Sequence, residues 1–288
     1  MRGRRAWHLG IIMIAAVAAA ACARSAPQAT APQPAASPQA EATATPAAQP
    51  TPAVPDLGGR EIKVGSDTTY PPFEYVDENK KIIGFDPDLM DEICKRAHCK
   101  ATFVTTAWDG IFVALAQGQF DAVASGVTIT EERLKTLDFT EPYLRYGQVV
   151  LVRSDESAIV GVDSLAGKKV GVQTGTTNDE KATALQKEGK VGEIKRYETF
   201  ALAVKALMNK DVDAVIIDSY AADGFINLNP DKIKKVGEPF TSEALGIAIK
   251  KGDATLKQAF DAALTQIKAD GTLDALYKKW FVERAPGK

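Results

Sequence analysis

The stretch from Trp108 to Tyr143 holds the residues best suited to binding a small charged molecule. It contains an aromatic ring, a polar strand end at Ser125-Gly126-Val127-Thr128, and Arg133 in the expected first turn of a helix. The guanidinium group of arginine offers a planar fork of N–H donors that matches a carboxylate. A helix start adds free backbone N–H groups and a positive partial charge. The combination predicts capture of a small zwitterion by its carboxylate, without chemistry on it.

Apolar periodicity predicts alternating strands and helices around these residues. Strands are expected at 120–124, 148–152, 169–172 and 213–217. One helix should have Asp86 as its N-cap and Pro87 as its first residue. A second should carry Trp108 on its apolar face, and a late helix over 256–267 should end before Gly271. This alternation is typical of an α/β fold.

Three short segments of the chain recur further on, and the spacing between the second and the third is the same in both copies. The repeated segments are 63–65 with 169–171, 114–115 with 206–207, and 121–123 with 213–215. The alignment places Ser125-Gly126 opposite Ile217-Asp218, with both pairs at the carboxyl end of an apolar strand. In open α/β sheets, ligands bind outside those strand ends. The repeat therefore predicts one cleft with a polar edge from each half.

The N-terminus has the features of an export signal. Three arginines at positions 2, 4 and 5 precede an apolar run over 9–21, which is too short to span a bilayer and suits a secretory signal. We expect a signal peptide at 1–21. Cys22 follows Ala19-Ala20-Ala21 and resembles the lipidated cysteine of a bacterial lipoprotein box, although leucine is usual at the position of Ala19. Ordinary cleavage near Ala21 with an incidental cysteine is the alternative.

Residues 22–56 are expected to form a lipidated cysteine and a linker. The segment 23–55 is almost entirely Ala, Pro, Thr, Ser and Gln, and it holds eight of the fifteen prolines. This composition cannot bury enough apolar surface to offset its ordering entropy, so disorder is expected. The protein should therefore be exported and anchored through Cys22 to the outer face of the cytoplasmic membrane, or be periplasmic.

Composition excludes several classes of function. The net charge is −2 and no basic run occurs, so nucleic acid is not an expected partner. Nucleophile, metal and phosphate-loop motifs are absent from the sequence, and no cofactor or metal is expected. Cys94 and Cys99 stand in Cys-Lys-Arg-Ala-His-Cys. In an exported protein, two such close cysteines favour a disulfide over a metal site.

From about Leu57 to Phe281 the chain resembles the family 3 bacterial solute-binding proteins, the amino-acid receptors of ABC importers. The motifs that carry the resemblance are 67–74 (DTTYPPFE), 84–89 (GFDPDL), 108–133, 138–143 (DFTEPY), 173–177 (QTGTT) and 214–218 (AVIID). The resemblance implies the two-lobed type II fold of periplasmic binding proteins. Each lobe is then a mixed β-sheet flanked by helices, with the ligand in the inter-lobe cleft. The implied lobes are 57–145 with 244–288, and 146–243, joined by crossings near Arg145 and Ala244.

The resemblance also implies how a zwitterion is held. Arg133 matches the arginine that binds the ligand's carboxylate, and Asp218 matches the acid that accepts its α-ammonium group. Lying on opposite lobes, the two side chains would couple binding to lobe closure. Alternatives without a ligand remain open. Arg133 could pair along an exposed helix face, and Asp218 could cap a helix beginning at Ser219.

Further positions match the family's contacts to the ligand backbone. Ser125, Gly126 and Thr128 correspond to strand-end positions that offer hydroxyl or backbone groups. The segment Gly175-Thr176-Thr177 precedes a helix expected near Asp179 and can present N–H groups to the carboxylate. A plain turn and N-cap is the alternative for this second segment.

The ligand's side chain should lie between aromatic rings. Tyr70 and Trp108 match flanking positions, although Trp108 also suits a core role, and Phe73 and Phe85 are expected in the core. Asp67 matches a position that binds the distal side-chain nitrogen in relatives that take cationic amino acids or glutamine. We therefore expect Arg, Lys or His as ligand, with Gln next, and repulsion of Glu and Asp.

The implied partners are the permease and ATPase of an ABC importer. The protein is expected to be a monomer, and it is expected to be a receptor and not an enzyme. The alternative is a cyclohexadienyl dehydratase-like enzyme on the same fold. Such an enzyme needs an acid placed at the leaving hydroxyl, and the sequence marks no residue for that role. Retention of an ammonium-binding acid, Asp218, favours the receptor.

Overall fold

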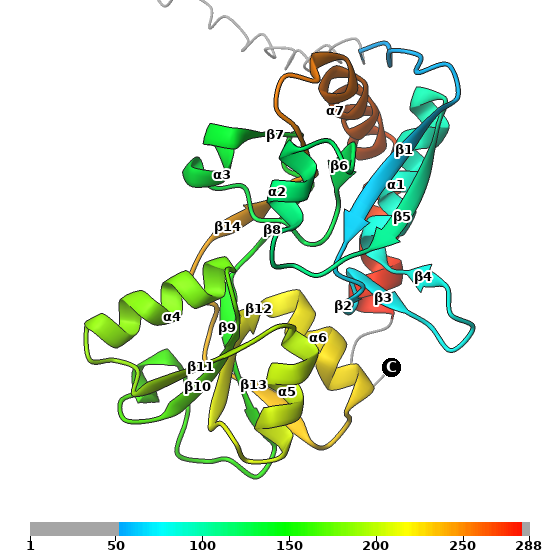
Figure 1. The fold of residues 1–288 in the computed structure, drawn as a ribbon. Helices are drawn as coiled ribbons and strands as arrows, with labels where there is room; N and C mark the ends of the chain where they lie inside the picture. Colours follow the sequence, from blue (N-terminus) through cyan, green and yellow to red (C-terminus); the bar gives the residue numbers. More distant parts are fainter. Residues whose placement is uncertain (1–51, 284–288) are drawn as a thin grey trace, which may run out of the picture. The chain divides into compact units, whose positions relative to one another are not determined.

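The structure, a computed structural model, describes residues 52–283 (Figure 1). The predicted signal peptide, Cys22 and the linker up to residue 51 lie outside the described residues. Within 52–283 no helix combines the length and the apolar character needed to cross a membrane.

The first lobe is built on a five-stranded sheet with the order β5-β1-β6-β15-β7. Its strands are β1 (Arg60–Ser66), β5 (Cys99–Thr105), β6 (Ala122–Val123), β7 (Leu137–Phe139) and β15 (Ala248–Lys250). The strand β1 runs parallel to β5 and β6, whereas β15 is antiparallel to β6 and β7. A small antiparallel sheet adds β2 (Thr69–Tyr70), β3 (Glu74–Val76) and β4 (Ile82–Ile83).

The helices of this lobe come from both ends of the described chain. They are α1 (Phe85–Ala97), α2 (Ile111–Ala116), α3 (Glu131–Thr136), α7 (Ala254–Ala269), α8 (Thr272–Tyr277) and the π-helical turn η2 (Lys278–Val282). A disulfide between Cys94 and Cys99 joins the last turn of α1 to the start of β5. The first lobe is thus discontinuous in sequence, because β15 and the last helices complete it.

The second lobe has a five-stranded sheet with the order β11-β10-β12-β9-β13. Its strands are β9 (Gln148–Arg153), β10 (Lys169–Gln173), β11 (Glu193–Tyr197), β12 (Ala214–Asp218) and β13 (Ile233–Val236). Its helices are α4 (Thr177–Lys187), α5 (Phe200–Met208), α6 (Ser219–Leu228) and the short 3-10 helix η1 (Val162–Ser164). The chain passes between the sheets through β8 (Leu144–Tyr146) and β14 (Glu243–Leu245), which pair with Arg145 opposite Ala244.

The sequence repeat occupies equivalent places in the two sheets. Val64 lies opposite Ala122 across β1 and β6, and Val170 lies opposite Ala214 across β10 and β12. At the start of each pair, an aspartate carboxylate accepts the backbone N–H of a lysine. These bonds join Asp121 to Lys63 at 2.9 Å and Asp213 to Lys169 at 2.8 Å. The repeated residues therefore fix the strand register in each lobe.

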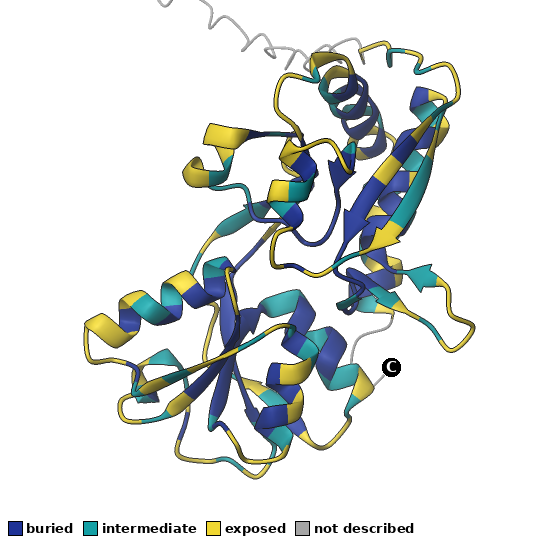
Figure 2. Cartoon of the chain, in the orientation of Figure 1, coloured by how far each residue is buried: buried dark blue, intermediate teal, exposed yellow. Residues whose placement is uncertain are grey.

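The core follows the apolar strands, which are dark blue in Figure 2 against exposed outer helix faces. Phe73 and Phe85 are fully buried, as predicted, and pack edge to face with ring centroids 6.4 Å apart. Burying a side chain of this size contributes about 1.5–3 kcal/mol. Phe73 lies in the turn between β2 and β3, and its ring stacks on that of Tyr70 with centroids 5.6 Å apart.

Two predicted helix starts were wrong. The helix α1 begins at Phe85 with Gly84 as N-cap, and Asp86 lies inside its first turn. A Cβ on Gly84 would come within 2.0 Å of the Phe73 carbonyl oxygen, so this chain path needs glycine. The carboxylate of Asp86 is buried and accepts hydrogen bonds from Gly126 N and Tyr143 Oη instead of capping the helix. Trp108 precedes α2 rather than lying within it.

Candidate ligand site between the lobes

A cavity lies between the two lobes, at the carboxyl ends of strands from both sheets. Its empty volume is about 320 Å³, which includes open solvent at its mouth. The first lobe contributes Asp67, Tyr70, Trp108, Ser125, Gly126, Thr128 and Arg133; the second contributes Gln173, Thr176, Thr177, Asn178, Phe200 and Asp218. The predicted residues line this cavity with the exception of Gly175, and three lining residues were not predicted.

Arg133 is positioned by the N-cap of a short helix and by aromatic rings. Thr130 caps α3 and its hydroxyl accepts the Arg133 N–H at 3.2 Å. The guanidinium donates from Nη1 to the Thr128 carbonyl at 2.8 Å and lies 4.7 Å from the Phe112 ring centroid. Burial lowers its pKa, and among residues 52–283 it forms no ion pair. The alternative of pairing along an exposed helix face does not occur, and donors remain for an anion.

Asp218 ends β12 and is almost fully buried. Its carboxylate accepts hydrogen bonds from Tyr70 Oη at 2.6 Å and Asn178 Nδ2 at 2.9 Å. It stands at the N-cap position of α6, but its side chain makes no capping bond, which excludes the capping alternative. Burial raises its pKa from 3.8 to about 7, although both hydrogen bonds oppose that change. A cation at this position would offset the cost of burying the charge.

The two opposite charges come from opposite lobes and remain separate. Within the described chain, Arg133 and Asp218 form no ion pair with each other, and burial disfavours the charged form of each. A zwitterion between them would supply an anion to the first and a cation to the second. Closing the cleft around such a ligand is therefore less costly than closing it empty.

Asp67 is a second carboxylate in the cavity, and both of its oxygens accept hydrogen bonds. Oδ1 accepts from Thr69 Oγ1, and Oδ2 accepts from Gln173 Nε2 across the cleft, each at 2.7 Å. The same Gln173 amide also donates to the Glu198 carbonyl at 2.9 Å. No lysine, arginine or histidine of the described range pairs with Asp67. Its negative charge is therefore solvated by dipoles and not balanced by a cation.

Aromatic rings from both lobes close the cavity. Tyr70 and Phe200 stack with centroids 5.2 Å apart and planes inclined by 27°. Trp108 donates from Nε1 to the Gly175 carbonyl at 3.2 Å, and it also belongs to the core cluster around Ile111. Trp108 therefore lines the cavity and also packs in the core of its lobe.

Two predicted contacts line the cavity but use their polar groups within the protein. Ser125 Oγ donates to Glu74 Oε1 at 2.8 Å and accepts the Asp67 N–H at 3.0 Å. The Gly126 N–H donates to the buried Asp86 carboxylate at 2.8 Å. Their place in the site is thus to support Asp67 and the strand end.

The loop before α4 differs from the prediction at one position. The Gly175 N–H donates to Asp179 Oδ2 at 3.3 Å, so it points into α4 and away from the cavity. Thr176 is the N-cap of α4, and its hydroxyl accepts the Asp179 N–H at 3.2 Å. The first turn that begins at Thr177 still offers unbonded N–H groups to an anion. Thr128 and Thr177 face each other across the cleft with hydroxyl oxygens 3.4 Å apart.

Two of the three residues that were not predicted could have been found from the sequence repeat. Extending the 63–65 and 169–171 match by two residues places Gln173 opposite Asp67. Extending the 114–115 and 206–207 match backward places Phe200 opposite Trp108. Asn178 has no such signal, since it is an ordinary polar residue one position inside α4.

Comparison with known proteins gives the same answer as the geometry. Residues 62–283 match the family model described as bacterial extracellular solute-binding proteins, family 3. The chain belongs to this family of binding proteins, and it has the two-lobed fold of its relatives.

Individual relatives extend the likeness. A probable histidine-binding protein of Neisseria gonorrhoeae is 36% identical over 242 residues, covering 83% of this chain and 87% of the relative. A solved ancestral arginine-binding protein bound to arginine is 40% identical, with a TM-score of 0.73, covering 77% of this chain and 98% of that one.

A third similar protein concerns the enzyme alternative. It is an ancestral amino acid-binding protein described as a precursor of cyclohexadienyl dehydratase, 40% identical with a TM-score of 0.71, covering 77% of this chain and 95% of that one. That protein is itself a binding protein. The family and these relatives therefore identify the chain as a binding protein and not an enzyme.

Proposed function

We propose that this protein is an extracytoplasmic receptor that binds a free cationic amino acid and delivers it to an ABC importer. The observation that carries the proposal is the charge of the cavity. Its lining holds two carboxylates, Asp67 and Asp218, and one guanidinium, Arg133. A ligand with a net charge of +1 balances this set, and arginine or lysine at neutral pH has that charge.

Each of the three charged side chains of the cavity pairs with one of the three charged groups of such a ligand. The ligand's carboxylate binds Arg133, where a planar fork of donors can hold both oxygens. The α-ammonium group binds Asp218. The cationic side chain then extends past Tyr70 and Phe200 toward Asp67, whose charge lacks a counter-ion in the described protein. Aromatic faces add about 0.5–2 kcal/mol to binding of a cation.

Relatives support a basic ligand without deciding which one. Two of the three relatives reported above are named for histidine and for arginine. Glutamine is the next candidate, because its amide can also donate to Asp67 while its neutral charge leaves that carboxylate unbalanced. Glutamate and aspartate are disfavoured, because Asp67 would repel their side-chain carboxylates.

Export and anchoring complete the proposal. A signal peptide at 1–21 takes the chain out of the cytoplasm, and a lipid on Cys22 holds it at the membrane through the linker 22–56. The folded part then comprises a first lobe of 57–145 and 244–288, and a second of 146–243. The permease and ATPase recognise the closed, ligand-bound form of a monomer.

Isothermal titration of ligand-free protein against the common amino acids tests the proposal. Arginine, lysine or histidine should bind most tightly, with a dissociation constant on the order of 1 µM or below. Glutamine should be weaker, and glutamate should show no binding. Preferential binding of glutamate or leucine would overturn the assignment of a cationic ligand.

A further inference from the structure

A second contact joins the two lobes outside the cavity. It is formed by Tyr220 and Gly224 of α6 in the second lobe with Pro71, Tyr277 and Phe281 of the first. We call these five residues the lip contact. None of them lines the cavity. In Figure 1, α6 and the red C-terminal helix lie on one side of the gap between the sheets, and β8 and β14 lie on the other.

Aromatic packing makes up one part of the lip contact. The ring of Tyr220 lies 4.7 Å from that of Phe281 and 5.8 Å from that of Tyr277, centroid to centroid. The hydroxyl oxygens of Tyr220 and Tyr277 are 3.3 Å apart. Aromatic pairs at such distances stabilise by about 0.5–1.5 kcal/mol beyond the burial of their area. The contact therefore favours the closed arrangement of the lobes whether or not a ligand is present.

Gly224 makes up the other part, as a steric fit. A Cβ at this position would lie 2.4 Å from the Pro71 carbonyl oxygen and 2.7 Å from Pro72 Cδ. All three nearest atoms belong to the first lobe, so the missing side chain is required by closure. Within a helix, glycine costs about 0.5–1 kcal/mol relative to alanine. The second lobe therefore gives up helix stability at the residue that lets the first lobe approach.

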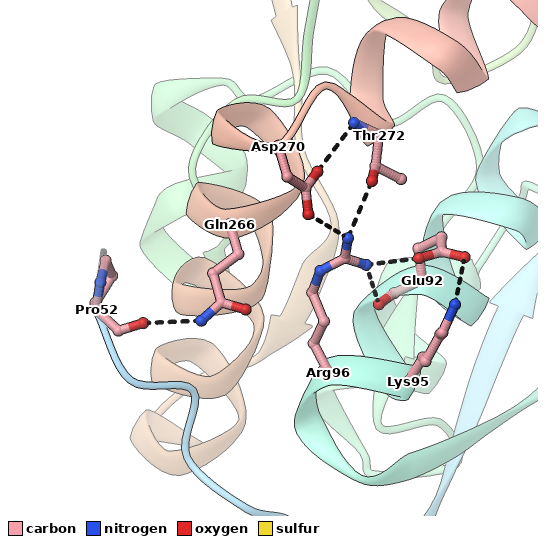
Figure 3. Close-up of polar contacts among 7 residues, drawn as sticks. All are labelled: Pro52, Glu92, Lys95, Arg96, Gln266, Asp270 and Thr272. Atoms are coloured by element: carbon pink, nitrogen blue, oxygen red, sulfur yellow. Dashed lines mark hydrogen bonds and ion pairs between the residues drawn. The ribbon is translucent and has the colours of Figure 1, made fainter. Parts of the chain in front are cut away.

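The first lobe holds its side of the lip contact rigidly, beginning with the turn between α7 and α8. Figure 3 shows Arg96 at the end of α1 reaching this turn, with hydrogen bonds to Asp270 Oδ2 at 2.7 Å and Thr272 Oγ1 at 3.0 Å. Arg96 also pairs with Glu92 at 2.6 Å. These bonds fix where α8 starts, and therefore where Tyr277 lies.

The last described turn is fixed to the same lobe by two kinds of contact. Asp88 accepts hydrogen bonds from Lys279 Nζ and Trp280 Nε1, each at 2.6 Å. The Phe281 ring packs 5.0 Å from the Phe85 centroid and 5.4 Å from that of Phe73. The C-terminal segment thus presents a preformed surface against which α6 docks.

We propose that Gly224 and Tyr220 set the affinity of the cleft for all its ligands alike, by stabilising the closed form through the lip contact. The inference rests on the proposed binding function, but it concerns residues that do not touch the ligand. Every ligand that binds the closed form gains the same free energy from this contact. Both residues are positioning residues, so their loss changes affinity but leaves selectivity among amino acids unaltered.

The decisive variant is Gly224→Ala, compared with Gly161→Ala as a matched control. A Cβ on Gly161 would have its nearest neighbour at 3.5 Å, in Gly237 of the same lobe, so the control adds a methyl group without obstructing closure. We expect Gly224→Ala to weaken arginine and glutamine binding by the same factor, about 10-fold or more, with faster dissociation. Ligand-free melting temperature should be unchanged or higher, because alanine favours the helix.

A second variant, Tyr220→Ala, removes ring contacts without adding bulk, and it should weaken both ligands equally by a smaller factor. Unchanged affinity in Gly224→Ala would overturn the inference, and so would a loss confined to one of the two ligands. A large fall in the melting temperature of ligand-free Gly224→Ala would also overturn the inference, because the lost affinity would then reflect a destabilised fold. If the unmodified protein binds no amino acid at all, the proposed function is wrong. If it binds amino acids but Gly224→Ala has unchanged affinity, only the inference about the lip contact is wrong.

Discussion

The two lobes share one scaffold but present different chemistry to the cleft. In each, a parallel strand pair has the same register, and an aspartate at the start of one strand holds a lysine N–H of the other. In each, a glycine of the first strand lies against an apolar side chain of the repeat. Gly65 meets Phe120, and Gly171 meets Val212 among its nearest neighbours. These shared features all lie within the body of the sheet.

The strand ends are where the lobes differ. In the first lobe, Gly126 follows β6 and donates its N–H to the Asp86 carboxylate. The equivalent position in the second lobe is Asp218, whose carboxylate accepts a hydrogen bond from Asn178. Asp67 in one lobe corresponds to Gln173 in the other, and the two are hydrogen-bonded to each other. The lesson is that the repeat preserves what holds each sheet together, while the ends diverge because each faces a different part of the ligand.

Each lobe is proposed to bind a different part of the ligand, and replacing Asp218 with asparagine should reduce ligand affinity the most. The variant keeps the shape of the side chain but removes the charge that faces the ligand's ammonium. Loss of one partner from a buried charge pair costs about 3–5 kcal/mol, so arginine should bind about 150- to 5,000-fold more weakly by isothermal titration. Asp213→Asn on the same lobe should leave the affinity unchanged. Equal affinity in Asp218→Asn and the unmodified protein would contradict the assignment.

Replacing Arg133 with lysine tests the carboxylate end, where the loss should be smaller. The positive charge remains, but a single ammonium group cannot reproduce two parallel N–H donors or the packing over Phe112. We expect arginine to bind about 10- to 100-fold more weakly, again by titration. The control is Lys135→Ala on the same helix, whose side chain is exposed and pairs with Glu132. A loss of the same size in both variants would show that α3 itself, and not the guanidinium, is responsible.

Replacing Asp67 with asparagine should alter selectivity more than affinity. The change removes the charge proposed to balance a cationic side chain while retaining a hydrogen-bonding group beside Gln173. Arginine should lose about 10-fold in affinity, equivalent to 1.4 kcal/mol, and glutamine should be nearly unaffected. The ratio of the two dissociation constants is the measurement. A parallel loss for both ligands would mean that Asp67 serves the fold of the cleft and not recognition of the side chain.

The smallest expected effect is a pH dependence of closure in the ligand-free protein. In the closed form burial raises the pKa of Asp218 from 3.8 to about 7, whereas solvent in an open cleft returns the pKa toward its ordinary value. Opening therefore releases a proton between these two values, so the open form gains as pH rises from about 4 to about 7 and gains no more above that. Small-angle scattering should show a larger radius of gyration at pH 8 than at pH 5. Asp218→Asn should abolish this change.

Much of the fold follows from local sequence pattern. The strands expected at 148–152, 169–172 and 213–217 correspond to β9, β10 and β12 within one residue at each end. Each is an apolar run between turn residues, so nearest neighbours in sequence suffice to define it. The strand expected at 120–124 is reduced to β6, Ala122–Val123. Its last predicted residue, Ala124, leads directly into the polar turn at Ser125.

The site was predictable in its members but not in its hydrogen bonding. The repeat points to Asp218 and the expected helix start points to Arg133, whereas Asp67 was identified only through the resemblance to the family. The partners of those residues come from distant parts of the chain. Gln173 lies 106 residues from Asp67, and Tyr70 lies 148 from Asp218. Such pairs depend on how the lobes close, and a local pattern carries no information about that. The same reason explains why Asp86 was expected to cap a helix and is instead buried beneath Gly126.

A crystal structure of the protein with bound L-arginine tests the central claim most directly, namely that each lobe holds one pole of the ligand's backbone. The ligand's carboxylate should lie within hydrogen-bonding distance of the Arg133 guanidinium, and its α-ammonium group within that distance of the Asp218 carboxylate. Its guanidinium should lie near Asp67. Arginine bound in the reverse orientation, or with both backbone poles on one lobe, would contradict the account.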